Sequence, residues 1–176
     1  MQKCRTVDVS FFDQAPARFA ATVEIEATPE KIFEIFEDAR AWTAWAPPIQ
    51  RVDWTSPKPF GVGTTRTVTM SFGMVGDELF IAWDRGKRMA FCFTSTTMPN
   101  VAAFGEDYHV EDVGNGRCRV TWKMAMDPEG FSKTLMPLTA PLMRWSLQFM
   151  LNRFRAYVEA QPDSKPAAAP ESATAA

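Results

Sequence analysis

The sequence predicts an α+β domain with an antiparallel sheet, two short helices near its start and one long helix at its end. Two observations predict this class. Strand-like segments follow one another through the middle of the chain, and short stretches of turn-forming residues connect them. Near the C-terminus, apolar residues recur with the helical period instead. Because short links join neighbouring strands as hairpins, the sheet is expected to be antiparallel.

The first strand is predicted at residues 19–27. Apolar residues alternate there with more polar ones, which is typical of a strand with one buried face and one face in water. The apolar positions are Phe19, Ala21, Val23, Ile25 and Ala27.

Two short helices are predicted directly after this strand. Thr28 suits the N-cap of the first helix and Pro29 its first helical position, and the helix is expected to end near Asp38. The second helix is expected at about residues 40–45. It must stop before Pro47, because a proline disfavours the helical conformation of the residue before it.

Six more strands are predicted, which gives a sheet of seven. They are Ile49–Trp54, Thr64–Met70, Val75–Asp84, Arg88–Ser95, Val101–Asp112 and Arg117–Met126. The connections between them carry Gly, Pro and Asn, the residues that favour turns.

The long helix is predicted at residues 141–160, and residues 130–140 are expected to form a bent lead-in because Pro137 and Pro141 each remove a helical hydrogen-bond donor. At about 100° per residue, the helix has two apolar sides that flank a mixed line. One interpretation is a helix that lies across a hollow, with its midline facing a ligand; the other is a deeply buried core helix. The midline residues are Ser146, Met150, Arg153 and Tyr157.

The composition excludes several classes of protein. A chain of 176 residues fits one domain, and a net charge of −2 with scattered basic residues argues against nucleic acid as a partner. Three widely spaced cysteines and a single histidine argue against a disulfide framework and a metal site. Neither a signal peptide nor a transmembrane segment is apparent, so a cytoplasmic protein is expected.

The predicted organisation has three parts. Residues 1–17 form an N-terminal extension, residues 18–160 the domain, and residues 161–176 a tail rich in Ala and Pro. The tail lacks the large apolar residues that would offset the entropy of ordering it, and it is expected to be disordered. The oligomeric state stays open.

Several motifs carry a resemblance to a known superfamily. Residues 27–38 read ATPEKIFEIFED, and Trp42 and the run Trp45-Ala46-Pro47 follow. Over residues 18–159 the chain resembles the START-like, Bet v 1-like (SRPBCC) superfamily, in particular its bacterial polyketide cyclase/dehydrase and lipid-transport branch. The resemblance implies a helix-grip fold, in which a curved seven-stranded sheet surrounds the long C-terminal helix and an apolar cavity lies between them.

If the apolar faces of the strands look into that cavity, a set of ligand-binding residues follows. Most are apolar wall residues, and the loops at residues 57–63 and 96–100 are possible gates. The candidates are Trp45, Arg66, Val68, Met70, Phe91, Phe93, Phe104, Glu106, Tyr108, Trp122, Met124, Ser146, Met150, Arg153 and Tyr157.

Arg66, Glu106 and Tyr108 stand out because they share strand faces with apolar residues. A charge in an apolar cavity is costly unless it is paired, so Arg66 and Glu106 are expected to face each other. They could polarise a carbonyl or hold a carboxylate; alternatively, they lie at the rim or form a structural ion pair. The only histidine, His109, alternates with Tyr108 and is expected to face solvent without a role.

Three functions remain open. The first is binding or transport of a hydrophobic small molecule, such as a lipid, a polyketide or an isoprenoid-like compound. The second is a cyclase- or dehydratase-type enzyme that uses Arg66, Glu106 and Tyr108 as acid, base or carbonyl-orienting groups. The third is an interaction module with a vestigial cavity. No cofactor is expected.

Overall fold

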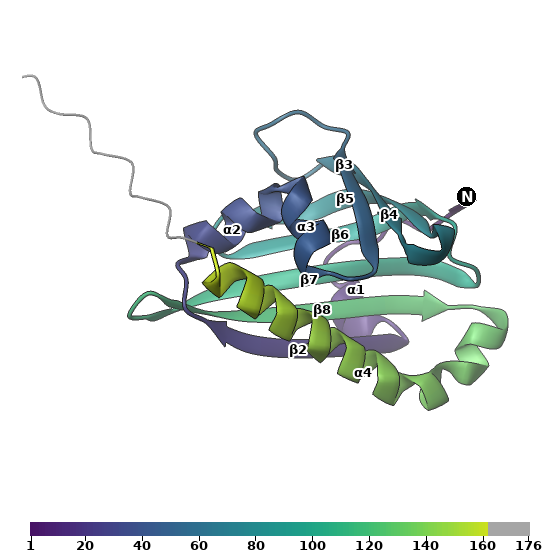
Figure 1. The fold of residues 1–176 in the computed structure, drawn as a ribbon. Coiled ribbons are helices and arrows are strands. Elements are labelled where there is room, and N and C mark those ends of the chain that lie inside the picture. The colour runs from purple at the N-terminus through teal and green to yellow at the C-terminus, as the bar shows by residue number, and fades with distance from the viewer. Residues whose placement is uncertain (162–176) are drawn as a thin grey trace, which may run out of the picture.

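A computed structural model describes residues 1–161 of the chain. Its main feature is a strongly curved antiparallel sheet with the strand order β2-β8-β7-β6-β5-β4-β3, as Figure 1 shows. These seven strands confirm the predicted sheet. Their bounds are β2 (Ala17–Ile25), β3 (Ile49–Trp54), β4 (Thr65–Met70), β5 (Val75–Asp84), β6 (Arg88–Thr96), β7 (Val101–Gly114) and β8 (Arg117–Pro128).

Helices α2 (Pro29–Glu37) and α3 (Ala39–Trp45) follow β2, as predicted. The Thr28 side chain accepts a hydrogen bond from the backbone N–H of Lys31 and caps α2. The Asp38 carboxylate accepts one from the backbone N–H of Arg40 at 2.9 Å and caps α3. The Thr28 cap thus marks the start of α2, and the Asp38 cap lies at the turn between the two helices.

The long helix α4 (Gly130–Glu159) begins earlier than the sequence suggests. It includes Pro137 and Pro141, so residues 130–140 belong to the helix itself, and Figure 1 shows this first part of α4 bent away from the line of the rest. Each proline removes one backbone donor, and the helix nevertheless continues through both positions.

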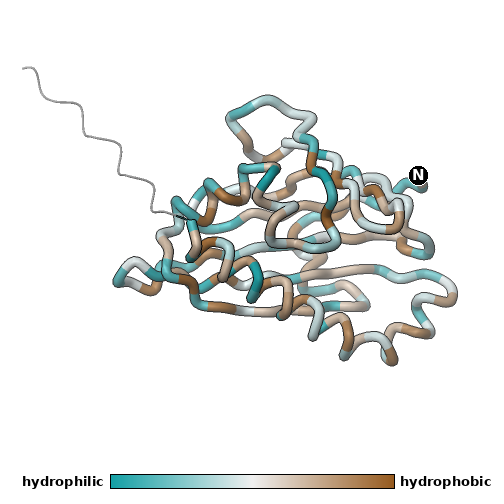
Figure 2. Tube along the Cα trace, in the orientation of Figure 1, coloured by the Kyte–Doolittle hydropathy of each residue, from teal (hydrophilic) through white to brown (hydrophobic). Residues whose placement is uncertain are grey.

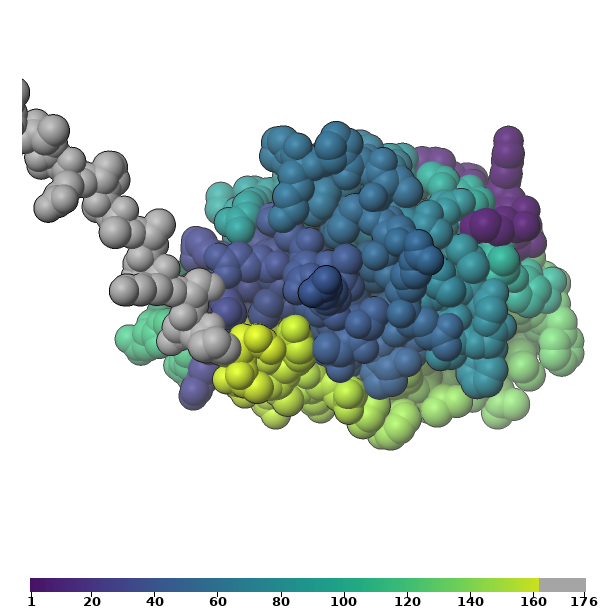
Figure 3. All heavy atoms as spheres, turned by 45° about the horizontal axis from the view of Figure 1, so that its top comes forward, coloured from purple at the N-terminus to yellow at the C-terminus, as the bar shows by residue number. Residues whose placement is uncertain are grey.

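The helices α2, α3 and α4 lie on the concave face of the sheet (Figure 1). Figure 3 shows the C-terminal part of α4 beside α2 and α3 on one surface of the molecule. The ring of Phe154 joins these elements, because it stacks on Phe36 and meets the edge of Trp45. A large apolar core therefore fills much of the space between the sheet and the helices.

The first residues of the chain cover the opposite, convex face. They form the two-residue strand β1 (Gln2–Lys3), which pairs with β6, and the short helix α1 (Phe11–Gln14). Phe11 and Phe12 pack there on small residues of the sheet and form a second apolar core. The tube in Figure 2 shows hydrophobic and hydrophilic residues following one another along the strands.

Candidate ligand-binding cavity

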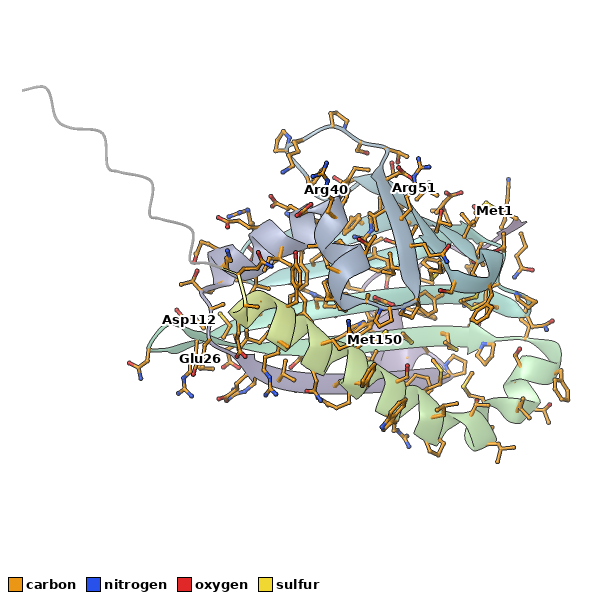
Figure 4. All side chains as sticks on the ribbon, viewed as in Figure 1. Met1, Glu26, Arg40, Arg51, Asp112 and Met150 are labelled. Atoms are coloured by element: carbon orange, nitrogen blue, oxygen red, sulfur yellow. The ribbon has the colours of Figure 1, made fainter. Side chains whose placement is uncertain are left out.

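A cavity of about 430 Å³ lies between the concave face of the sheet and the helices α3 and α4. Strands β4 to β8 supply most of its wall, and α3 and α4 close it on the other side. Met150 lies on the side of α4 that faces the sheet (Figure 4). β-Bulges bend strands, and register shifts of this kind interrupt the β5–β6 pairing at Asp77/Glu78 and Phe80/Ala82, beside the cavity.

Twelve of the fifteen candidate residues line the cavity. Eleven come from the predicted faces of α3 and the strands, and one comes from α4. They are Trp45, Arg66, Val68, Met70, Phe91, Phe93, Phe104, Glu106, Tyr108, Trp122, Met124 and Met150.

Ser146, Arg153 and Tyr157 are not part of the lining, so of the four midline residues only Met150 faces the cavity as expected. The inward face of α4 is instead formed by residues such as Leu147 and Leu151, which are fully buried. Ser146, Arg153 and Tyr157 therefore lie to one side of the cavity. Arg153 donates to the backbone carbonyl of Trp45 at 3.2 Å and thereby joins α4 to α3.

The charged residue opposite Arg66 is Glu78, not Glu106. Arg66 and Glu78 are register partners on β4 and β5, and Arg66 Nε donates to Glu78 Oε2 at 2.5 Å. Both side chains are almost completely buried, with exposed fractions of 1% and 4%. The expectation that Arg66 pairs with Glu106 is therefore wrong, because the β4–β5 register supplies a nearer carboxylate.

Aromatic rings surround the Arg66 guanidinium. Its central carbon lies 4.2 Å from the ring centroid of Trp42 and 4.9 Å from that of Phe91. Such rings attract a cation through their negative faces, and the attraction is stronger away from water. One guanidinium nitrogen, Nη1, is buried without a hydrogen-bond partner among the described residues. Arg66 thus keeps one donor available for a ligand.

Glu106 forms a second polar pair with Tyr108, whose hydroxyl donates to Glu106 Oε2 at 2.7 Å. Burial raises the pKa of the Glu106 carboxyl to about 8, although this hydrogen bond opposes the rise. Burial and the neighbouring Glu106 raise the pKa of Tyr108 as well. At neutral pH both groups are therefore predominantly protonated and uncharged.

Two indole N–H groups complete the polar part of the cavity. Trp45 Nε1 and Trp122 Nε1 are buried, and within residues 1–161 neither makes a hydrogen bond of good geometry, although the Trp122 indole lies close enough to the Glu106 carboxyl to lower its pKa. A buried donor without an acceptor is unfavourable in an empty site. Together with Arg66 Nη1, these groups make the cavity rich in donors that lack acceptors.

Sequence reasoning missed nine lining residues, most of them at the α3–β3 turn or among the methionines. Glu78 is the most important of them, because it pairs with Arg66. The sequence indicated its position, because Glu78 lies on the same face of its strand as the apolar Phe80. The nine are Trp42, Ala46, Pro48, Ile49, Met74, Glu78, Met98, Met126 and Met143.

The two predicted gate loops differ in their relation to the cavity. Met98, in the loop at residues 96–100, belongs to the lining, whereas no residue of 57–63 does. His109 lies half-exposed on the outer face of the sheet, where Nε2 is 2.9 Å from Asp107 Oδ2.

No group of three or more His, Cys, Asp or Glu side chains within the described part of the chain could hold a metal ion. No helix in that part is long and apolar enough to span a membrane. All three cysteines are buried and free.

Residues 16–159 match the protein family described as polyketide cyclase / dehydrase and lipid transport. The chain belongs to this family. This confirms the superfamily to which the sequence motifs pointed. An uncharacterized protein of Mycobacterium tuberculosis is 44% identical to this family member over 161 residues, which cover 92% of this chain and 96% of that protein.

Solved structures agree with the family at the level of the fold. A START superfamily protein from Mycobacterium smegmatis superposes with a TM-score of 0.61 at 13% identity, covering 81% of this chain and 94% of that one. The Zhui aromatase/cyclase from Streptomyces sp. R1128 superposes with a TM-score of 0.66 at 11% identity, covering 81% and 93%. This family member therefore has the predicted helix-grip fold.

Proposed function

We propose that the protein binds a hydrophobic small molecule that carries an acceptor oxygen, such as a carbonyl or carboxylate. The observation that carries the proposal is the set of three buried donors without a well-aligned acceptor, Arg66 Nη1, Trp45 Nε1 and Trp122 Nε1, on residues that line a mostly apolar cavity. An acceptor oxygen on the ligand would satisfy donors that have no partner in the described chain.

The size and wall of the cavity support the same function. Its volume of about 430 Å³ lies within the range of small-molecule sites. Most of the lining is aromatic or methionine, which suits a flat or flexible apolar body. A lipid, a polyketide or an isoprenoid-like compound with an oxygen at one end meets both requirements, and binding or transport of such a compound is the first candidate function.

Two naphthalene probes of nearly equal shape test the acceptor requirement. 2-Acetylnaphthalene carries a carbonyl, and 2-ethylnaphthalene does not. We expect the ketone to bind at least about tenfold more tightly, because only the ketone accepts a hydrogen bond from the donors. Quenching of tryptophan fluorescence measures both affinities. Equal affinities would remove the acceptor from the proposal.

A cavity-filling variant tests the location of the site. Met150→Trp places a bulky ring in the cavity, and we expect it to weaken binding of the ketone at least about tenfold. Phe149→Trp is the matched control, because Phe149 lies next to Met150 but on the exposed side of α4. If neither probe binds and the protein isolated from its own organism carries no small molecule in native mass spectrometry, the binding function is overturned.

A cyclase- or dehydratase-type enzyme is the second candidate. The observation that favours it is the protonated Glu106, with its hydrogen bond to Tyr108, in the same cavity as the guanidinium of Arg66. A neutral carboxyl can donate a proton to a ligand carbonyl, and the Arg66 cation could stabilise developing negative charge. Because the cavity is not filled by side chains, an interaction module with a vestigial cavity is the least supported function.

We also propose that the protein acts in the cytoplasm. Three free and buried cysteines support a location in a reducing compartment such as the cytoplasm.

A further inference from the structure

The helix α4 carries a stripe of large apolar side chains on the side away from the sheet. Its members recur at alternating intervals of four and three residues over five turns, and all are exposed, Leu138 by 78% and Phe131 by 72%. We call these six residues the α4 stripe. They are Phe131, Leu135, Leu138, Leu142, Trp145 and Phe149.

The spacing of the stripe is that of a coiled-coil seam. Apolar residues at alternating three- and four-residue intervals form the seam with which one helix packs against another helix. The six residues make three consecutive pairs of seam positions between residues 131 and 149. The stripe therefore has the geometry to receive a second helix along about 27 Å of its length.

The core supports the first half of α4 only through the partly buried side chains of Met136, Ala140 and Met143. No residue from Gly130 to Ser146 is buried, whereas the second half buries four apolar side chains in the core. Helices in proteins depend mainly on packing of an apolar face, and this half also contains Pro137 and Pro141. In Figure 1 it runs along the outer edge of the molecule.

The residues beside the stripe are uncharged. Interface cores are depleted of charged residues, whereas helices that lie on a membrane surface are usually rich in Lys and Arg next to their apolar face. The neutral flanks thus favour a protein partner, and they allow two copies of the helix to meet without repulsion. The flanking residues are Ser132, Thr134, Thr139, Pro141, Ser146 and Gln148.

The exposed area of the stripe matches the requirement of a dimer. The six side chains expose roughly 700 Å² together, close to the ~800 Å² per partner of a standard stable interface. Residues 162–176 could not supply this cover, because their sequence has no apolar side chain larger than Ala or Pro.

We propose that the α4 stripe is a dimer interface, in which the α4 helices of two copies of this chain pack side by side across a two-fold axis. The contact is isologous, since each stripe meets the same stripe of the other copy. Its residues are separate from the cavity lining, so the dimer forms whether or not a ligand is bound.

Sedimentation equilibrium of the full chain tests this proposal. We expect a mass of twice the monomer mass of 19.8 kDa at micromolar concentration. The double variant Leu138→Glu/Leu142→Glu places two charges at the centre of the seam, and it should weaken the association at least about 100-fold. Both positions are exposed in one copy, so the variant should keep its fold and its circular dichroism spectrum.

The matched control is Val62→Glu, which places a charge at an equally exposed apolar residue outside α4. It should leave the mass of the dimer unchanged. A wild-type chain that stays monomeric at 100 μM and above would overturn the proposal, and so would a double variant that still dimerises. Flotation of monomeric wild-type chain with vesicles of phosphatidylcholine and phosphatidylglycerol, lost in the double variant, would assign the stripe to a lipid surface instead.

Discussion

Arg66 occupies an environment that few cations tolerate in proteins. It is buried, it is enclosed by aromatic rings, and Glu78 is its only carboxylate partner within the described residues. Burial raises the pKa of Glu78, and the Arg66 charge opposes this rise. The opposite charge of each side chain therefore offsets part of the free-energy cost of burying the other.

A double-variant experiment on this pair follows. Arg66→Met leaves the Glu78 carboxyl buried without its partner, and we expect a loss of about 3–5 kcal/mol in the free energy of unfolding. Arg66→Met/Glu78→Met removes both charges and should recover most of that loss. Urea denaturation measures both values. If the double variant is no more stable than the single one, the pair does not account for the stability of this site.

Glu106 gives a prediction on pH. Its folded pKa of about 8 lies above that of an unfolded glutamate, so the folded state holds the proton more tightly. Its contribution to stability is complete below about pH 4 and is lost as the pH rises towards 8. Between pH 5.5 and 7.5, the wild type should lose on the order of 2 kcal/mol relative to Glu106→Gln.

Thermal unfolding of both chains across this pH range measures the difference. If the difference in stability between the wild type and Glu106→Gln stays constant over this pH range, Glu106 is ionised throughout the range.

Single residues show where sequence reasoning reached its limit. The alternation of apolar and polar positions predicted that Arg66, Glu106 and Tyr108 share the inner face, and they do. The partner of Arg66 depends on the β4–β5 register, which is set by the turn around η1 (Ser71–Gly73). Phe72 adopts a left-handed backbone conformation in that turn, which a sequence pattern does not reveal.

At the scale of elements, α1 packs closely on the convex face of the sheet because the sheet has a glycine, Gly105, where the two meet. A Cβ atom built on Gly105 would lie 2.9 Å from the backbone carbonyl oxygen of Phe91 and 3.2 Å from the ring of Phe12. The missing side chain of Gly105 is thus what brings α1 and β7 together.

Gly105→Ala should therefore destabilise the fold by about 1–3 kcal/mol, because the backbone of β6 cannot move away easily. Gly61→Ala is the matched control, since a Cβ there meets no atom within 4 Å and should leave the stability nearly unchanged. Urea denaturation compares the two. Equal effects of the two changes would contradict the packing argument.

The elements differ in how well the sequence predicts them. In β2 and β8, apolar and polar residues alternate several times, and the predicted bounds of these strands agree with the structure to within a few residues. The strand β1 and the helix α1 have only two and four residues, too few for a period to be visible. The start of α4 was missed because two prolines normally argue against a helix.

At the scale of the whole molecule, two apolar cores share a single sheet. The larger core lies on the concave face with the helices, and the smaller one lies beneath α1 on the convex face. Five of the six tryptophans belong to the larger core or pack against it, and the sixth, Trp145, lies on α4, so tryptophan fluorescence reports on the concave side and on α4. Because both cores depend on the same strands, we expect them to unfold together.

Phe12→Ala tests this coupling. Removal of the buried ring should cost about 3 kcal/mol, and tryptophan fluorescence and circular dichroism should both shift to the same lower midpoint. Val9→Ala, at a partly exposed neighbouring position, should shift neither midpoint appreciably. A convex-face core that melts separately would leave the fluorescence midpoint of Phe12→Ala unchanged.

The cavity wall has an uneven stiffness that follows from its composition. Seven of the ten methionines in the chain lie in it, whereas its donors sit on Arg66 and on rigid indole rings. Methionine side chains change shape at little cost, but the donors are held by tightly packed neighbours. Under the proposed function, the protein should therefore select strictly for the position of the acceptor oxygen of the ligand and tolerate variation in the shape of its apolar part.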